Sequence, residues 1–290
     1  MCPEYSVSDL SISSNIDLHS HTHCSDGALS PAALMARAVD NGVTTLAITD
    51  HDTVDAFDGL PAAPGSLQLV RGIEFSTTWG SVGIHVLGLD IDPGSPAILE
   101  GVSHQAAARE RRAERIGANL AKLGVEGALE GAAHHAAGSN IGRPHFARHL
   151  VDAGITDSME TAFKKYLGDG KAGDVRESWA SMSQVVDWIR AAGGIAVLAH
   201  PLAYKLTRTR LKRLLNDFIE AGGEGMEVVS GQQNEQQTRS LGQLCRDMGL
   251  LGSRGSDFHA PGQGWKELGA VAPMPERVSP VWERFRQPPA

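Results

Sequence analysis

The 290-residue sequence has few cysteines, few aromatic residues and no long hydrophobic run. Its three cysteines, Cys2, Cys24 and Cys245, are too few and too scattered for a disulfide framework, which favours a reducing compartment and predicts a cytoplasmic protein. The longest apolar stretches, such as residues 195–199, are far shorter than the roughly 20 residues of a membrane helix. Residues 1–15 are polar and lack the apolar centre of a signal peptide. No membrane association is therefore expected.

Positive charge is also scarce, because 26 Lys and Arg residues face 34 Asp and Glu residues and leave a net charge of −8. This sign opposes non-specific binding to long duplex nucleic acid, but it is compatible with short phosphorylated ligands. Repeats of fixed period are absent, and no feature of the sequence indicates a protein partner. At roughly 150 residues per domain, the length suits two domains or one barrel with an insertion.

Short β-rich runs alternate with helical patterns along the chain, which is typical of parallel βα units in an α/β fold. The pattern predicts seven strands, at residues 16–21, 44–49, 67–76, 82–89, 195–199, 225–229 and 250–256. Ser30 followed by Pro31 predicts the start of a helix, and Gly42 predicts its end. Further helices are expected at residues 182–192, 207–221 and 235–248.

Residues 103–174 carry helical patterns without a strand, and we interpret them as an insertion in a barrel formed by residues 1–102 and 175–290. Barrel enzymes build substrate sites from loops that follow strands, so the insertion is expected to contribute to the substrate site. The alternative is a helical segment that packs on the barrel without contacting substrate. The Gly/Ala-rich patch at 127–138 predicts a loop. An arginine-rich run is interleaved with Glu110 and Glu114 and predicts a solvated, salt-bridged helix face; its arginines are Arg109, Arg111, Arg112 and Arg115.

Histidines and carboxylates recur near the ends of the predicted strands. His19 and His21 lie two residues apart on a strand, so both imidazoles project from one face. Barrel active sites form at the carboxyl ends of strands, and buried charges need partners or metals. The sequence therefore predicts a metal site. The other candidates at or near strand ends are Asp26, His51, Glu74, His85, His200, Asp257 and His259.

Five motifs resemble those of the PHP (polymerase and histidinol phosphatase) family: HSH at 19–21, TDH at 49–51, GIE at 72–74, AHP at 199–201 and SDFH at 256–259. The run 17–31 and the insertion motif IGRPH at 141–145 resemble the branch of this family that acts on nucleoside 3′,5′-bisphosphates and short RNA. The resemblance covers nearly the whole chain. It implies a distorted (β/α)7 barrel of the amidohydrolase-like type, with a helical insertion and a trinuclear metal site.

The resemblance also implies a ligand set for three divalent ions, with Glu74 as a bridge and Glu74, Asp257 and His200 as the catalytic residues. The first ion would take His19, His21, Glu74 and Asp257, the second would take Glu74, His85 and His200, and the third would take Asp26, His51 and His259. Some family members carry a histidine in place of Asp26. Mixed imidazole and carboxylate ligands suit manganese, iron or zinc, and the resemblance favours manganese. A hydroxide that bridges the metals is the expected nucleophile.

Arg143 in the insertion motif is the predicted phosphate clamp, because a guanidinium presents a fork of donors that matches phosphate oxygens. His145 and Lys171 complete the predicted substrate-binding set. Protonation of the leaving alcohol needs an acid that is not a ligand, and Asp50, Asp52 and His145 are all candidates.

These features together predict a metal-dependent phosphomonoesterase. It would hydrolyse the 3′-phosphate of nucleoside 3′,5′-bisphosphates to nucleoside 5′-monophosphates, and it would also act as a 5′–3′ exonuclease on short 5′-phosphorylated RNA. One alternative is a phosphatase for histidinol phosphate or another small molecule, against which the arginine of the insertion motif argues. The other is a non-catalytic PHP module, which predicts missing ligands, whereas this sequence lacks none of them.

Overall fold

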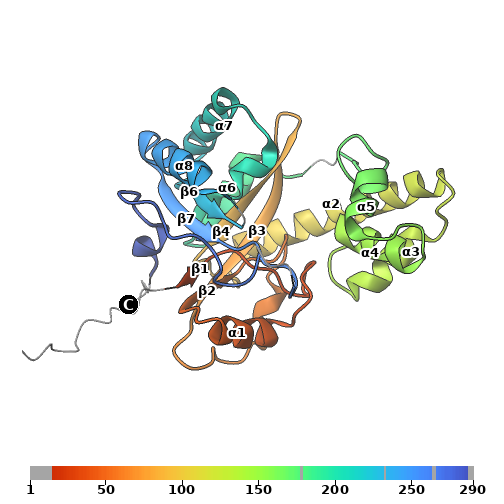
Figure 1. Cartoon of the computed structure of the whole chain (residues 1–290), viewed down its shortest axis with the longest axis horizontal. Coiled ribbons are helices and arrows are strands. Elements are labelled where there is room, and N and C mark those ends of the chain that lie inside the picture. The colour runs from red at the N-terminus through yellow and green to blue at the C-terminus, as the bar shows by residue number, and fades with distance from the viewer. Residues whose placement is uncertain (1–14, 177–178, 232, 263–265, 287–290) are drawn as a thin grey trace, which may run out of the picture.

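A single seven-stranded sheet, with its strands in the order β1 to β7, forms the centre of the computed structural model (Figure 1). The structure describes residues 15–176, 179–231, 233–262 and 266–286, so Cys2 and the other residues of the polar start up to position 14 lie outside the described residues. All seven predicted strands are confirmed, although the first is shorter than expected. The strands are β1 Ile16–Asp17, β2 Thr45–Ile48, β3 Gln68–Trp79, β4 Val82–Leu89, β5 Ile195–Leu198, β6 Gly225–Ser230 and β7 Leu251–Gly255.

The sheet curls into a nearly closed barrel, as predicted. The backbone N–H of Leu18 donates to the Arg254 carbonyl at 3.0 Å, and that of Asp257 donates to the His19 carbonyl at 2.9 Å, which ties the first strand to the last. Most neighbouring strands are parallel. The exception is β4, which runs antiparallel to both β3 and β5.

The antiparallel β4 corrects one expectation from the sequence. His85 does not lie at the carboxyl end of a parallel strand; it lies in a β-hairpin, opposite Ser76 of β3. The tight turn that joins the two strands contains Gly80 with a φ of +59°, a conformation that glycine adopts without strain. The chain therefore returns toward the barrel from the hairpin tip, and this return brings His85 to the end of the barrel where Glu74 lies.

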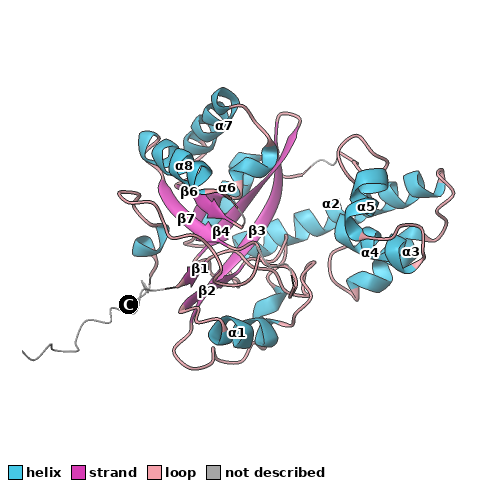
Figure 2. Cartoon of the chain, in the orientation of Figure 1, coloured by secondary structure: helices cyan, strands magenta, loops and turns pink. Residues whose placement is uncertain are grey.

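Helices surround the sheet (Figure 2). The side chain of Ser30 accepts a hydrogen bond from the Ala33 backbone N–H at 3.2 Å, so the predicted start of the first helix is confirmed. No helix of the described chain is long and apolar enough to cross a membrane. The helices around the barrel are α1 Pro31–Asp40, α6 Met182–Ala191, α7 Arg208–Glu220 and α8 Glu235–Asp247, with short 3-10 turns η1 Asp55–Phe57, η3 Pro201–Tyr204 and η4 Val281–Arg284.

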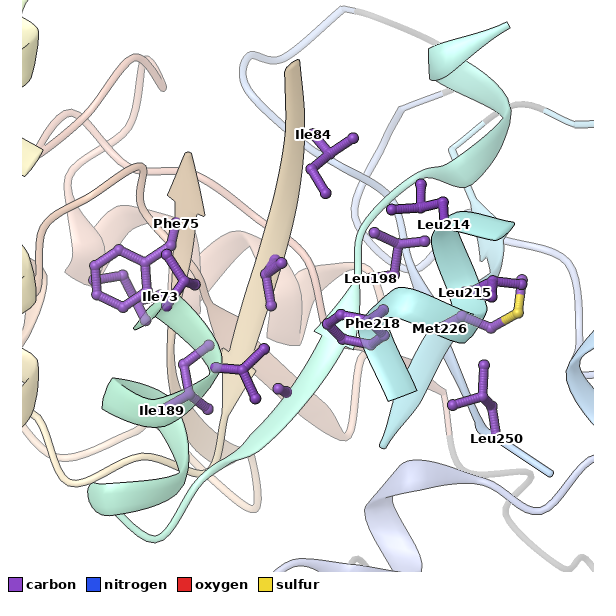
Figure 3. Packing of buried hydrophobic residues seen from close by; sticks show 14 of the residues in the cluster. Ile73, Phe75, Ile84, Ile189, Leu198, Leu214, Leu215, Phe218, Met226 and Leu250 are labelled. Atoms are coloured by element: carbon purple, nitrogen blue, oxygen red, sulfur yellow. The ribbon is translucent and has the colours of Figure 1, made fainter. Parts of the chain in front are cut away.

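Alternation of side chains along the strands creates two apolar layers. Leu198 of β5 faces outward and belongs to the layer that packs against Ile189 of α6 and Phe218 of α7 (Figure 3). Its neighbour Val197 belongs to the other layer, together with Leu87 of β4. Both faces of the sheet are thus covered by apolar side chains, so a functional site can form only at the ends of the strands.

The described residues of the insertion form helices joined by turns, with no strand, and α3, α4 and α5 lie at the far end of α2 from the barrel (Figure 1). Its elements are α2 Pro96–Ala121, α3 Ala128–Ala136, α4 Arg143–Asp152, α5 Met159–Ala162 and the π-helical turn η2 Phe163–Leu167. Helix α2 connects the two parts, because Ile98 lies in the barrel core and Ile116 lies in the core of the insertion. The division at residue 103 stays a prediction.

The loop predicted at residues 127–138 is wrong, because most of this patch forms α3. Ala128, Ala132 and Ala136 recur every four residues and are buried in the core of the insertion. Alanine has the highest helix propensity, and its small side chain allows close packing. The alanines therefore favour a helix here, and the flanking glycines lie at its ends.

Candidate metal centre

The predicted ligands converge at one end of the barrel. They come from the segment after β1, the segment after β2, β3, β4 and the segments after β5 and β7, so residues far apart in the sequence meet at one place. His200 and Asp257 have φ values of +24° and +54°, which are strained for residues other than glycine. The residues brought together are His19, His21, Asp26, His51, Glu74, His85, His200, Asp257 and His259.

Four donors form a first group with the dimensions of a metal site. The Nε2 atom of His19 lies 3.1 Å from Nε2 of His21 and 3.2 Å from Oε2 of Glu74. The Oδ1 atom of Asp257 lies 3.6 Å and 3.5 Å from the same two imidazole nitrogens. Tetrahedral donors at the usual metal–ligand lengths are about 3.3–3.6 Å apart. This group therefore fits one divalent ion.

Glu74 belongs to a second group as well. Its Oε1 atom lies 2.9 Å from Nδ1 of His85 and 2.9 Å from Nε2 of His200. The two oxygens of one carboxylate thus face different sets of histidines, which is the arrangement of a bridging ligand.

A third group surrounds Asp26. Its oxygens lie 3.3 Å from Nε2 of His259 and 3.9 Å from Nε2 of His51. His51 also connects this group to the others, because its Nδ1 atom lies 3.1 Å from Oε2 of Glu74.

Several of these buried atoms have no hydrogen-bond partner among the described residues, namely His21 Nδ1, Asp26 Oδ1, His51 Nδ1, Glu74 Oε2 and His200 Nδ1. Buried polar atoms are normally paired, so such a concentration requires an explanation. Divalent cations would satisfy them together. The donor chemistry and the missing partners both fit the metals that the sequence predicts.

The carboxylates of the cluster are held in their charged form. Burial alone would raise the pKa of Glu74, but His51 and His19 hold it well below its usual range. Burial is likewise outweighed for Asp257, whose pKa is held well below its usual range by the nearby side chains of His259, His21 and Lys266. Ionised oxygens of this kind are available as ligands.

Glu227 contacts two of the predicted ligands and was missed by the sequence interpretation. Its buried carboxylate lies 2.9 Å from Nδ1 of His19 and accepts a hydrogen bond from the backbone N–H of His200. This contact directs the other nitrogen of His19 toward the cluster, the role that outer carboxylates play around metal-binding histidines. A single acidic residue within the apolar strand β6 was the available signal.

A cavity of about 740 Å³ lies beside the donor cluster. Asp26, His51 and His85 line one part of it, and the tip of the β3–β4 hairpin lines another. The insertion and the segment that follows it supply arginines and aromatic rings to the wall: Arg109, Arg112, Arg143, Phe163, Arg176 and Trp179.

The structure brings one of the three predicted substrate-binding residues to this cavity. Arg143 lines the wall, with its guanidinium 5.9 Å from the centre of the Phe163 ring. His145 is buried outside the cavity wall, accepts a hydrogen bond from the Gly142 backbone N–H at 3.0 Å, and has its pKa lowered to about 4 by burial. Lys171 is exposed and is not part of the wall.

Neither Asp50 nor Asp52 lines the cavity. Asp50 accepts hydrogen bonds from Thr22 and Ser25, which hold the loop that carries Asp26. Asp52 pairs with Arg109, whose Nε lies 2.7 Å from its Oδ2. The choice of general acid among Asp50, Asp52 and His145 stays a prediction.

The prediction of a solvated helix face is wrong for Arg109, which is only 7% exposed. The buried carboxylate of Asp52 needs a charged partner, and Arg109 supplies it across 57 residues of sequence. No local pattern signals such a contact.

A barrel that gathers imidazole and carboxylate donors at one end defines the class of the barrel metallohydrolases. A family model for the PHP domain matches residues 17–134. The chain belongs to the PHP family, as the sequence motifs predicted.

Several relatives cover almost the whole chain. One is the 3′,5′-nucleoside bisphosphate phosphatase of Chromobacterium violaceum, which is 41% identical over 93% of this chain and 96% of its own length. Another is the 5′-3′ exoribonuclease Rnm of Escherichia coli, which is 44% identical over 97% of both chains.

Solved structures share the fold. An amidohydrolase from Chromobacterium violaceum, with bound sulfate and no metal, matches with a TM-score of 0.88 and 40% identity over 96% of this chain and 99% of that one. A metal-dependent phosphoesterase from Bifidobacterium adolescentis matches with a TM-score of 0.77 and 26% identity over 93% of both chains.

Proposed function

We propose that the protein is a metal-dependent phosphomonoesterase that removes the 3′-phosphate from nucleoside 3′,5′-bisphosphates and releases nucleoside 5′-monophosphates. We also propose that it degrades short 5′-phosphorylated RNA from the 5′ end. The observation that carries this proposal is one cavity whose wall includes both donor residues of the cluster and Arg143. The names of the phosphatase from Chromobacterium violaceum and of the exoribonuclease from Escherichia coli support the same substrate class.

We infer that three divalent ions, with manganese favoured, occupy the three donor groups. Such ions would supply positive charge for the phosphate and would lower the pKa of a bound water. The protein itself holds the donors in place, with Glu74 shared between two groups and Glu227 orienting His19. Mixed imidazole and carboxylate donors suit manganese, iron and zinc.

Arg143 would bind the second phosphate of the substrate. A phosphate on the far side of the ribose cannot share the donor cluster, so it needs a separate cation. Binding of this remote group can orient the 3′-ester for attack, which turns binding energy into catalysis.

Replacing Arg143 with alanine is expected to raise KM for adenosine 3′,5′-bisphosphate by roughly tenfold to a hundredfold, because a charge-assisted hydrogen bond contributes about 1.5–3 kcal/mol. The effect on adenosine 3′-monophosphate should be much smaller, since that substrate lacks the second phosphate. Steady-state kinetics on both substrates measure the difference. Lys122→Ala removes an exposed positive charge from the same insertion, away from the cavity wall, and should change neither KM. Equal effects of Arg143→Ala on both substrates would contradict this role.

Protein expressed with manganese is expected to contain about three metal ions per chain by elemental analysis. Three donor groups support this number: Glu74 is shared by two of them, and His51 of the third contacts Glu74. His51→Ala should reduce it, because this histidine contacts Glu74 and Asp26. A reproducible content near one ion, unchanged by His51→Ala, would contradict the trinuclear site.

A phosphate-release screen with manganese tests the proposed function against its alternatives. We expect the highest kcat/KM for nucleoside 3′,5′-bisphosphates among sugar phosphates, histidinol phosphate, nucleotides and short RNAs. Preference for histidinol phosphate would favour the alternative phosphatase. Absence of turnover on every substrate would favour a non-catalytic module, although all nine predicted donors are present.

We further infer a cytoplasmic location. The described cysteines, Cys24 and Cys245, are free thiols, which suits a reducing compartment.

A further inference from the structure

The cavity wall contains a second pairing of arginine with an aromatic ring. The guanidinium groups of Arg109 and Arg112 lie 5.6 Å and 5.8 Å from the centre of the Trp179 ring. Arg143 lies at a similar distance, 5.9 Å, from the ring of Phe163. One cavity therefore contains the same combination of cation and π-surface twice.

The backbone next to Trp179 is fixed on two sides. The Thr77 hydroxyl donates to the Ala180 carbonyl at 2.7 Å, and the Ala180 N–H donates to Oε1 of Gln105 at 3.2 Å. Ser181 also forms a bridge with Thr78 of the hairpin. The backbone beside Trp179 is thus fixed between α2 and the β3–β4 hairpin, and the half-buried Trp179 lines the cavity.

The two arginines are built into this wall as well. Arg109 is paired with Asp52, and Arg112 donates from Nε to the Val175 carbonyl at 3.1 Å. They lie three residues apart on α2 and so share one face of the helix. The chain has a net charge of −8, yet several cationic side chains line this one cavity. This local positive charge suits an anionic ligand.

A ring beside guanidinium groups is the chemistry that recognises single-stranded nucleic acid, because bases stack on aromatic faces and phosphates attract the cations. A nucleoside bisphosphate carries one base and can use one such pairing. The cavity of about 740 Å³ lies in the upper part of the range for small-ligand sites, which is roughly 300–1,000 Å³. A second pairing would serve a second nucleotide.

We propose that Trp179, with Arg112 beside it, forms a second nucleotide subsite that stacks the base following the scissile phosphate of a short RNA. The subsite rests on the proposed function, since it serves the RNA substrate of the same centre. It makes Trp179 a determinant of substrate length, needed for RNA and dispensable for a single nucleotide.

Kinetics of Trp179→Ala on two substrates test the subsite. For a 5′-phosphorylated RNA trinucleotide, we expect kcat/KM to fall by about tenfold or more, mainly through KM, which is the effect of losing one stacked base. For adenosine 3′,5′-bisphosphate, we expect less than a twofold change. Trp179→Phe keeps an aromatic face and should retain most of the activity on RNA.

Trp79→Ala is the matched control. Trp79 also has an arginine over its ring, with Arg210 at 5.7 Å, but it donates to Asp217 and does not line the cavity. This variant should leave both substrates unaffected. Arg112→Gln provides a second test that keeps the indole, and it should also weaken RNA more than the bisphosphate.

The outcomes separate this inference from the proposed function. Wild-type protein that hydrolyses neither substrate would overturn both. Wild-type activity on both substrates, with Trp179→Ala equally impaired on each or impaired on neither, would overturn the subsite alone. Selective loss of RNA turnover in both Trp179→Ala and Arg112→Gln would support it.

Discussion

Replacing Glu74 with glutamine is expected to reduce turnover by more than about a hundredfold and to lower the metal content of the purified protein. The Oε2 atom of this buried carboxylate lies 3.1–3.3 Å from nitrogens of His19, His21 and His51, and Oε1 lies 2.9 Å from His85 and His200. An amide removes the negative charge and replaces one donor oxygen with an NH2 group that has no lone pair for a metal. Loss of an outer partner of a ligand already costs tenfold to a hundredfold, so loss of the shared ligand should cost more.

Two further substitutions of glutamate by glutamine provide comparisons for Glu74→Gln. Glu227→Gln leaves the donor set intact but weakens the contact that orients His19, and we expect an intermediate loss of about tenfold to a hundredfold. Glu235→Gln, on an 82% exposed side chain in α8, should have no effect. Phosphate release and elemental analysis measure all three variants. A Glu74→Gln protein with wild-type turnover and metal content would remove this residue from the centre.

Replacing Arg109 with alanine is expected to lower the free energy of unfolding by about 3–5 kcal/mol, the usual cost of leaving one partner of a buried ion pair alone. The pair joins the insertion to the barrel beside the donor cluster, because Asp52 follows the predicted ligand His51 and Arg109 lies on α2. Asp52 is fully buried, and although burial would raise its pKa, Arg109 helps to hold that pKa below its usual range. Without Arg109 the carboxylate keeps the Ser76 N–H and the Gln105 amide as donors but loses its cation.

Urea unfolding measures this cost, and an exposed ion pair provides the control. Arg239 and Glu235 pair four residues apart on α8, with side chains that are 63% and 82% exposed, so Arg239→Ala should cost less than about 1 kcal/mol. The double variant Asp52→Asn, Arg109→Met removes both charges and should recover part of the stability lost in Arg109→Ala. Equal stabilities of Arg109→Ala and Arg239→Ala would show that the buried pair contributes nothing.

Local patterns in the sequence were sufficient for much of the fold. Alternation of β-rich and helical runs located all seven strands, and Ser30 followed by Pro31 located the start of α1. The antiparallel direction of β4 did have a signal in the sequence: only residues 77–81, with Gly80 among them, separate the two predicted strands, which is too short for a parallel crossover and typical of a hairpin. Alanine-rich α3 was missed because the glycines that flank it are typical of a loop. In the structure these glycines, Gly127 and Gly138, have φ of +68° and +96° and lie at the two ends of the helix.

For the candidate site too, some residues could be predicted from local patterns in the sequence and others could not. Histidines and carboxylates near strand ends could be identified one strand at a time, and the nine predicted donors lie together in the structure. The side chains around them depend on contacts between distant segments. Arg109 reaches Asp52 across 57 residues, and Glu227 reaches His19 across 208 residues, so neither role leaves a local pattern.

The most direct test of the proposed activity is to identify the product formed from adenosine 3′,5′-bisphosphate by the manganese-loaded protein. Chromatography against both monophosphate standards distinguishes the two positions of cleavage. Attack at the 3′-phosphate, with the 5′-phosphate held by Arg143, predicts adenosine 5′-monophosphate and one equivalent of phosphate. Accumulation of adenosine 3′-monophosphate, or no phosphate release at all, would contradict the proposed function.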